Sequence, residues 1–287
     1  MEVDCEGCAG CCIDWRPLAD GALEHERRGP YEPLDDAYNL VSLRREEIRR
    51  FVEGGQGDAL TPRLWTGDGD SVTVGGVELA AIDRRPTFLI GLRHVPKPVG
   101  PFGAEPTWLS TCVFLDPDSL QCRIHDAESY PETCQTYPGS NLLLGAETEC
   151  ERVEREHGGH RLLDTEAPPD AEPMLGPGAV GTRVFAHPEP DRIEAAVARI
   201  RDGEATARDR AEFVAVAAAA SPGTVEIEES YYERTRERIQ TTDSWVGGAI
   251  DDWQRRARTE TADPALAESI EAPRGAPQPA GWEGTTE

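Results

Sequence analysis

The stretch Cys5-Glu6-Gly7-Cys8-Ala9-Gly10-Cys11-Cys12 places four cysteines within eight residues near the start of the chain. No other segment of similar length devotes half its positions to one rare residue. A single cysteine is often just a small buried side chain, but a close-packed core has no need of this regular spacing. The spacing therefore predicts that the four sulfurs bind something.

The charge of the chain excludes one class of partner. The sequence has 54 acidic and 29 basic residues, for a net charge of −25, and Lys97 is its only lysine. An acid excess with almost no lysine resembles the halophilic type of protein, which keeps a strongly hydrated, carboxylate-rich surface. Because such a surface repels phosphate backbones, we expect no nucleic-acid partner.

The sequence also indicates a compartment. The longest apolar run, residues 213–220, is far shorter than the roughly 20 residues of a membrane span, and the amino terminus lacks a signal-peptide pattern. We therefore expect a cytoplasmic protein with no membrane partner. In a reducing cytosol, clustered thiols bind metal more often than they form disulfides, so a disulfide framework is the less favoured alternative.

Eight cysteines in all are candidate metal ligands. Thiolates bind soft or borderline metals, which makes an iron–sulfur cluster or zinc the expected cofactor. Three ligands at C-x2-C-x2-C are more typical of an iron–sulfur loop than of a zinc knuckle, whereas the downstream cysteines suit either metal. The candidate ligands are Cys5, Cys8, Cys11, Cys12, Cys112, Cys122, Cys134 and Cys150.

The position of Cys12 next to Cys11 argues against a single metal centre. Side chains of adjacent residues diverge, by about 100° on a helix. Cys11 and Cys12 are therefore not expected to bind the same mononuclear zinc, and we expect Cys12 to join a second site with some of the four downstream cysteines. Eight thiolates permit two four-cysteine centres, but the sequence does not show how the ligands divide.

The motif C-E-G-C-A-G-C-C resembles the defining motif of the CxxCxxCC cysteine-cluster family, also called YkgJ-like, a zinc- or iron-chelating domain. The resemblance continues at Cys112-Val113-Phe114-Leu115, at Cys122-Arg123-Ile124-His125, and at residues 128–138, E-S-Y-P-E-T-C-Q-T-Y-P. It covers roughly residues 5–150 and implies metal chelation. His125 replaces the family's usual tyrosine and Tyr130 its usual arginine, which leaves the sulfurs intact.

Whether the protein is an enzyme stays open. One relative by motif, the flagellin lysine-N-methylase, is an enzyme associated with an iron–sulfur cluster, but only analogy extends methyl transfer to this chain. The alternatives are a purely structural zinc module and an enzyme supported by a cluster. His125, His157 and His160 are weaker candidate ligands, because most histidines are ordinary surface or partly buried residues and a polar Gly-Gly turn is the plainer explanation of residues 157–160.

The expected fold class is α+β. We expect a small irregular metal-stapled domain with short hairpins and helices over residues 1–164, and a Pro/Gly-rich connector over 165–190. A mainly helical region would follow over 191–262, and a disordered acidic tail over 263–287.

Individual elements are also predicted. An apolar face predicts a helix over residues 42–52, and a Gly-Gly pair predicts a hairpin over 72–79. Residues 87–92 have the pattern of a strand. The Asp116–Ser119 turn should join two short strands and bring Cys112 close to Cys122. Further helices are expected around residues 193–200, from Thr206 to Pro222, and over 245–253.

Overall fold

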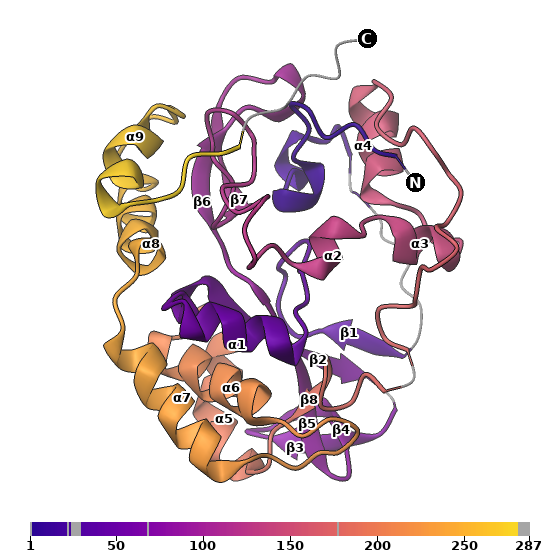
Figure 1. Ribbon diagram of the computed structural model, residues 1–287, viewed down its shortest axis with the longest axis vertical. Helices are drawn as coiled ribbons and strands as arrows, with labels where there is room; N and C mark the ends of the chain where they lie inside the picture. Colours follow the sequence, from indigo (N-terminus) through magenta and orange to yellow (C-terminus); the bar gives the residue numbers. More distant parts are fainter. Residues whose placement is uncertain (1, 22, 24–29, 68, 177, 281–287) are drawn as a thin grey trace. The chain divides into compact units, whose positions relative to one another are not determined.

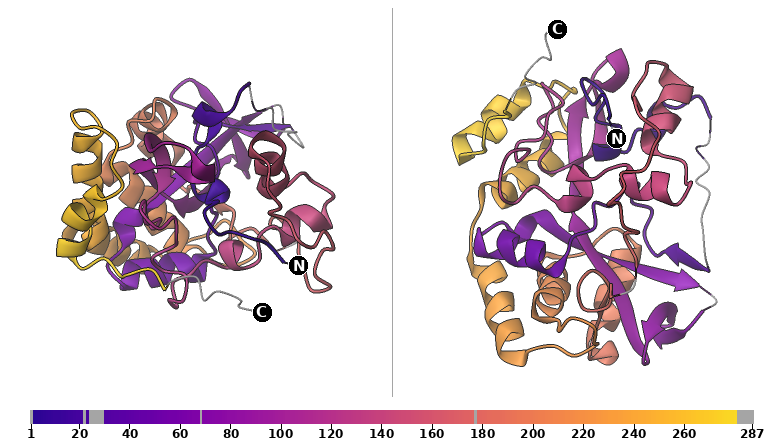
Figure 2. Two further views of the ribbon diagram at one scale, coloured as in Figure 1. Left: turned by 90° about the horizontal axis from the view of Figure 1, so that it is seen from above. Right: turned by 45° about the vertical axis from the view of Figure 1, so that its right-hand side comes forward.

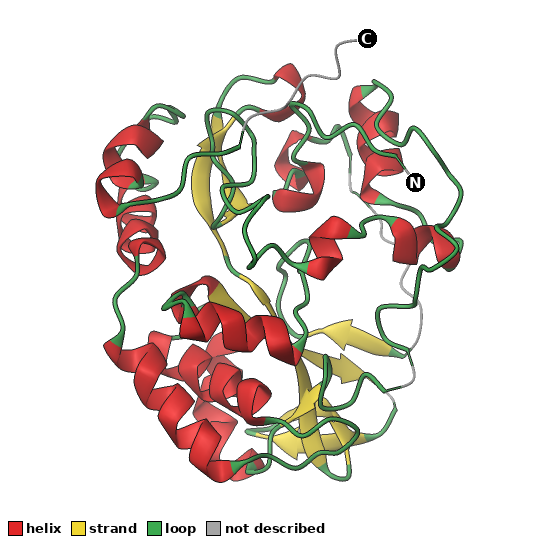
Figure 3. Cartoon of the chain, viewed as in Figure 1, coloured by secondary structure: helices red, strands yellow, loops and turns green. Residues whose placement is uncertain are grey.

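The computed structural model describes residues 2–21, 23, 30–67, 69–176 and 178–280 (Figure 1). The fold is α+β, as predicted (Figure 3). The chain forms two compact units, each built from separated segments. Unit 1 contains Met1–Glu24, His94–Pro173 and Trp245–Glu287, and unit 2 contains His25–Arg93 and Met174–Ser244. No helix in the described ranges combines the length and apolar character needed to span a bilayer.

Unit 2 is an antiparallel sheet covered by helices. The strand order is β1-β2-β5-β4-β3, and β8 also pairs with β5. The strands are β1 (Tyr31–Pro33), β2 (Leu60–Gly67), β3 (Ser71–Val74), β4 (Val77–Ile82), β5 (Arg85–Leu92) and β8 (Phe185–Ala186). The helices are α1 (Arg45–Glu53), η3 (Gly57–Ala59), η5 (Pro190–Ile193), α5 (Glu194–Arg201), α6 (Ala207–Ala219) and α7 (Glu229–Thr241).

The core of unit 2 is apolar and centres on α6. This helix packs on β2 and β5 and between α1 and α7, and Figure 2 shows the helices against the strands in two more views. Residues 213–219, within the longest apolar run, are all fully or almost fully buried. Phe213 meets Phe88 of β5 edge to face at 4.9 Å between ring centroids. Hydrophobic burial of this kind is the main force that stabilises a fold.

Most predicted elements of unit 2 are confirmed. The helix predicted at 42–52 is α1, although it begins only at Arg45 and ends at Glu53. The Gly-Gly hairpin joins β3 to β4, and both Gly75 and Gly76 have the positive φ that the turn requires. Thr206 caps α6 and exchanges hydrogen bonds with Asp209, a capping box.

Unit 1 has shorter elements around one hairpin. Strands β6 (His94–Val99) and β7 (Thr107–Cys112) pair in antiparallel register. Helix α8 packs on β6, and its buried stripe is the predicted one, Val246, Ala249, Ile250 and Trp253. The helices are η1 (Gly10–Cys12), η2 (Arg16–Leu18), η4 (Pro101–Gly103), α2 (Glu132–Gln135), α3 (Gly139–Leu143), α4 (Glu149–His157), α8 (Trp245–Arg256), α9 (Leu266–Ile270) and η6 (Ala272–Arg274).

The two units cut across the linear division expected from the sequence. The helices after residue 191 divide between the two units. Helices α5, α6 and α7 belong to unit 2, with the sheet of residues 60–92, whereas α8 and α9 belong to unit 1, with the β6–β7 hairpin. The carboxy-terminal tail also differs from expectation. Residues 266–274 form α9 and η6, and Ile270 and Glu271 are completely buried. Residues 281–287 lie outside the described part of the chain.

Candidate metal centre

The amino-terminal cysteines lie on a tight loop. The Cys8 amide donates to the Cys5 carbonyl and the Cys12 amide to the Ala9 carbonyl. Gly7 and Ala9 adopt positive φ, so the backbone turns sharply twice within the motif. These turns are the local reason why the spacing C-x2-C-x2-C-C brings its sulfurs to one region.

Two pairings fix this loop within unit 1. On one side, the Asp4 amide donates to the Arg161 carbonyl at 2.8 Å, just after α4. On the other, Ile13 forms an antiparallel bridge with Thr111, and the Asp14 amide donates to the Ser110 carbonyl at 2.7 Å. The register of this bridge makes Cys12 and Cys112 the next facing pair.

Cys112 and Cys122 are brought together, as the turn between them predicted. Cys112 ends β7, and the chain folds back so that Leu115 bridges Cys122. The Arg123 amide donates to the Phe114 carbonyl at 2.8 Å, and Asp116 caps the turn by accepting from Ser119. The two predicted strands are reduced to this single bridge.

Cys134 and Cys150 come from short helices. Cys134 lies in α2, and Cys150 is the second residue of α4. Helix α4 packs against η1, which contains Cys11 and Cys12 (Figure 1). Trp15, completely buried, donates its indole Nε1–H to Glu149 beside Cys150. The structure therefore brings all eight predicted ligands into unit 1, although five separate parts of the sequence supply them.

All eight cysteines are free thiols, and most are partly or fully buried. Burial, with the charge of Cys112, raises the pKa of Cys122 to about 12. Burial likewise raises the pKa of Cys112 and of Cys150. Without a bound cation these thiols hold their protons at neutral pH, and a metal ion would displace those protons on binding.

The sulfurs of Cys11 and Cys12 lie 3.9 Å apart, in contact with each other. The expectation that adjacent side chains diverge is therefore too strong for this 3₁₀ turn. A hydrogen bond from Cys12 lowers the pKa of Cys11, and the same bond raises that of Cys12. Within the described ranges, no three cysteine, histidine, aspartate or glutamate side chains converge closely enough to hold a metal ion as they stand.

The candidate histidines make other contacts. His157 stacks on Phe102 at 4.5 Å and meets the Trp15 ring at 5.4 Å. His160 is exposed, after a turn in which Gly158 and Gly159 have positive φ. His125 is also exposed, and its ring lies 4.8 Å from that of Tyr130. The two positions that depart from the CxxCxxCC pattern therefore contact each other.

Tyrosines line the cysteine region. Burial raises the pKa of Tyr130, and the charges of Cys134 and Cys122 raise it further. Burial and the charge of Cys11 do the same for Tyr137, whose hydroxyl oxygen accepts a hydrogen bond from the Glu149 amide. These two tyrosines therefore flank the thiols.

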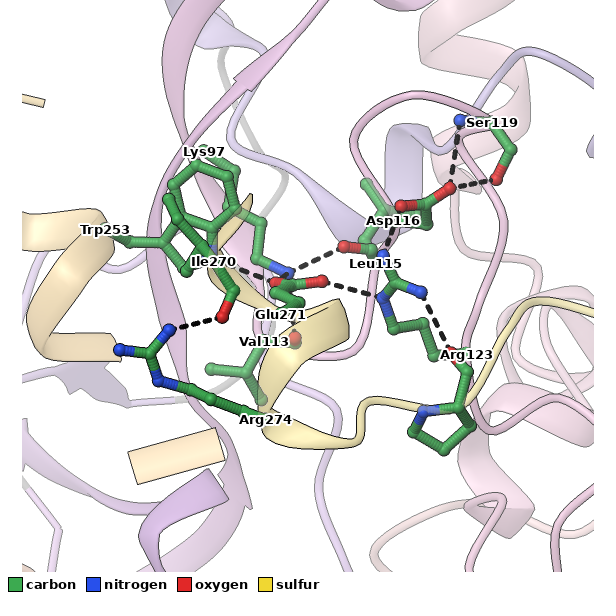
Figure 4. A network of polar contacts seen from close by, with 11 residues as sticks. Lys97, Val113, Leu115, Asp116, Ser119, Arg123, Trp253, Ile270, Glu271 and Arg274 are labelled. Atoms are coloured by element: carbon green, nitrogen blue, oxygen red, sulfur yellow. Dashed lines mark hydrogen bonds and ion pairs between the residues drawn. The ribbon is translucent and has the colours of Figure 1, made fainter. Parts of the chain in front are cut away.

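A buried ionic network that the sequence did not predict contacts the residues that follow Cys112. Lys97 of β6 is completely buried, and its ammonium donates to the carbonyls of Val113 and Leu115 at 2.8 and 2.7 Å (Figure 4). It also pairs with the completely buried Glu271 at 2.6 Å. The sequence carried one signal for this network, because Lys97 is the only lysine in a chain whose other basic residues are arginines.

Glu271 connects this network to Cys122. Its carboxylate accepts from the Trp253 indole at 2.9 Å and from Arg123 at 2.7 Å. Arg123, next to Cys122 in the chain, also pairs with Asp116 and donates to the Pro277 carbonyl. Two cations thus face two carboxylates, and a buried network of this kind stabilises a fold only while it is complete.

The fold and the site define an α+β protein with eight free thiols gathered in one of two units. A model of a family of unknown function, DUF7531, matches residues 1–283, and the chain belongs to this family. No curated protein and no solved structure matches the chain. The resemblance to the CxxCxxCC cysteine-cluster family stays a prediction.

Proposed function

We propose that this protein binds metal through the thiolates of unit 1, as an iron–sulfur cluster or as zinc. The observation that carries the proposal is the gathering of the cysteines. Five separated parts of the sequence supply eight unoxidised thiols, and all eight lie in unit 1. Unit 2, of similar size, has none.

The donor set fits a soft or borderline cation. Thiolates prefer zinc and iron in clusters, and the nearby histidines face rings or solvent instead. Bound metal would supply folding energy, because thiolates from distant segments would be tied to one inorganic group. The segment from Val113 to Pro131 has no helix or strand of its own in the described structure, although Val113, Phe114 and Leu115 are buried. Such a segment gains most from cross-links of this kind.

The C-x2-C-x2-C loop favours a cluster over a single zinc ion, because three closely spaced thiolates are typical of iron–sulfur ligation. Zinc with a purely structural role is the second candidate. Its support is the donor set, because sets of four cysteine thiolates are typical of closed structural zinc sites.

Anaerobic purification followed by metal and acid-labile sulfide analysis tests the proposal. A cluster would give a brown protein with sulfur-to-iron charge-transfer absorption, iron and sulfide. Zinc would give a colourless protein with zinc and no sulfide. If the full chain retains neither metal after purification and after reconstitution with each, the proposal is wrong.

A further inference from the structure

We propose that the eight thiolates form two adjacent four-cysteine centres rather than one. The first centre consists of Cys5, Cys8, Cys11 and Cys150, and the second of Cys12, Cys112, Cys122 and Cys134. This division rests on the proposed function, because it assigns ligands for the metal proposed above. It adds what the sequence left open, namely which distant cysteine joins which part of the amino-terminal motif.

The first set lies on the side of the loop that faces α4. Gly10 touches α4 so closely that a Cβ there would come within 2.7 Å of the Val153 side chain. The Cys8 sulfur lies 3.5 Å from the same point, and Cys150 is in the first turn of α4. Arg161, after α4, donates to the Glu6 carbonyl beside Cys5 at 3.0 Å. Helix α4 and its following residues therefore hold Cys5, Cys8 and Cys150 in one neighbourhood.

The second set lies on the side that faces β7. The antiparallel bridge between Ile13 and Thr111 makes Cys12 face Cys112. The bridge between Leu115 and Cys122 returns the chain to the end of β7, where the Leu115 amide donates to the Cys112 carbonyl at 3.0 Å. Backbone pairing therefore fixes three of the four members without reference to their sulfurs.

Cys134 of α2 completes the second set, because a four-cysteine centre leaves one place beside Cys12, Cys112 and Cys122.

Cys11 and Cys12 mark the boundary. Their sulfurs are in contact at 3.9 Å, so the two centres adjoin at this pair. Cys12 completes the set with Cys112, which leaves Cys11 to complete the set with Cys150. Within the described ranges no three of these side chains converge as they stand, so each set closes only when its side chains rotate as they exchange protons for metal.

The two centres differ in their support. The Lys97–Glu271–Arg123 network contacts the loop between Cys112 and Cys122 at both of its ends. Lys97 donates to carbonyls just after Cys112, and Arg123, just after Cys122, pairs with Glu271 (Figure 4). Among the described residues, no contact of this network reaches Cys5, Cys8 or Cys150. Glu271 therefore offers a way to weaken the second centre without changing any cysteine.

The first test compares cysteine variants of the anaerobically reconstituted full chain. Cys8→Ser and Cys134→Ser should each lose about half of the bound metal, and the double variant should lose all of it. In Cys134→Ser, iodoacetamide should modify Cys12, Cys112 and Cys122 while the first set stays protected, as read by peptide mass spectrometry. Cys8→Ser should give the converse pattern.

The second test uses a variant that keeps every thiol, so its result is informative even if a cysteine variant fails to fold. Glu271→Gln should speed metal transfer from the second centre to a colorimetric chelator by at least about tenfold, the usual effect of losing a supporting residue. Alkylation should reach Cys112 and Cys122 first and leave Cys5, Cys8 and Cys150 protected. Glu268→Gln, on the exposed face of α9, should leave both centres unchanged.

The outcomes separate the two proposals. A wild-type chain without metal overturns the proposed function itself. A wild-type chain that binds metal, but loses all of it in either single variant, overturns only the division into two centres. If cysteines of both sets are alkylated together in Glu271→Gln, the division into two centres is again wrong, whereas the proposed function stands.

Discussion

The two units of this chain are stabilised in different ways. Unit 2 buries a continuous apolar layer, with Phe213 of α6 against Phe88 of β5 and the alanines and valines of residues 214–219 around them. Unit 1 has short helices and a long irregular segment, and it buries the charges of Lys97, Arg123 and Glu271. The comparison teaches that the same chain uses hydrophobic packing where elements are long and buried ion pairs where they are short.

Metal removal should have the largest effect, and this effect should be confined to unit 1. Chelation under reducing conditions should abolish hydrogen-exchange protection between Cys112 and Cys134, whereas β2 and β5 of unit 2 should keep theirs. The reason is that structural metal sites contribute about 10–16 kcal/mol to the folding of small metal-dependent domains. Hydrogen exchange read by mass spectrometry measures both segments in one experiment. Equal loss of protection in both would show that the units do not differ in this way.

Lys97→Met should have the next largest effect. Removing one partner of a buried ion pair leaves Glu271 facing Arg123 and Trp253 with one cation fewer, and such changes cost about 3–5 kcal/mol. Denaturant unfolding, followed by protection in β6 and β7, measures this. Arg258→Met removes a cation from an exposed position of the same unit and should cost almost nothing. Equal stability of the two variants would contradict the role of the network.

Acid should have the smallest of these effects, and it should lower the stability of unit 2. Burial alone would raise the pKa of Asp209, but hydrogen bonds from Arg199 and Thr206 lower it to about 2. Because the folded pKa lies below the unfolded value of about 3.9, this stabilisation is present above pH 4 and disappears as pH falls towards 2. Asp209→Asn should cost about 1 kcal/mol at pH 7, as for other capping residues, and remove this part of the acid dependence.

Thermal unfolding between pH 2 and 7 measures the difference. Asp191→Asn, at an exposed position of the same unit, is the matched control and should keep the acid dependence of the wild type. An Asp209→Asn profile parallel to that of the wild type would contradict this role of the capping box.

Local signals in the sequence predicted local structure well. The Gly75-Gly76 pair gave a hairpin because only glycine accepts positive φ at both positions without strain. Thr206 and Asp209 gave the start of α6 because the two side chains satisfy amides that no earlier turn can. The turn after Cys112 brought Cys122 back, because Asp116 and Ser119 close it through their own side chains.

The contacts between distant segments of the chain were harder to predict from the sequence. The segment after residue 263 is rich in proline, glycine and acidic residues, which predicted disorder, yet Glu271 is the centre of a buried network. Composition cannot show that a carboxylate will meet Lys97, which lies far earlier in the chain. The grouping of helices also escaped prediction, because periodicity identifies the apolar face of α6 but not the sheet that covers it.

The sequence by itself determined the chemistry: eight thiols, a turn-rich amino-terminal loop, an acidic surface and a set of amphipathic helices. Only the tertiary structure decided which cysteines lie together. Backbone pairing of Ile13 with Thr111 and packing of α4 on η1 bring the end of β7 and the helix that carries Cys150 to the amino-terminal loop. The physical reason is that residue type and spacing fix what a side chain can bind, whereas contacts between distant segments form only when the whole chain buries its apolar surface.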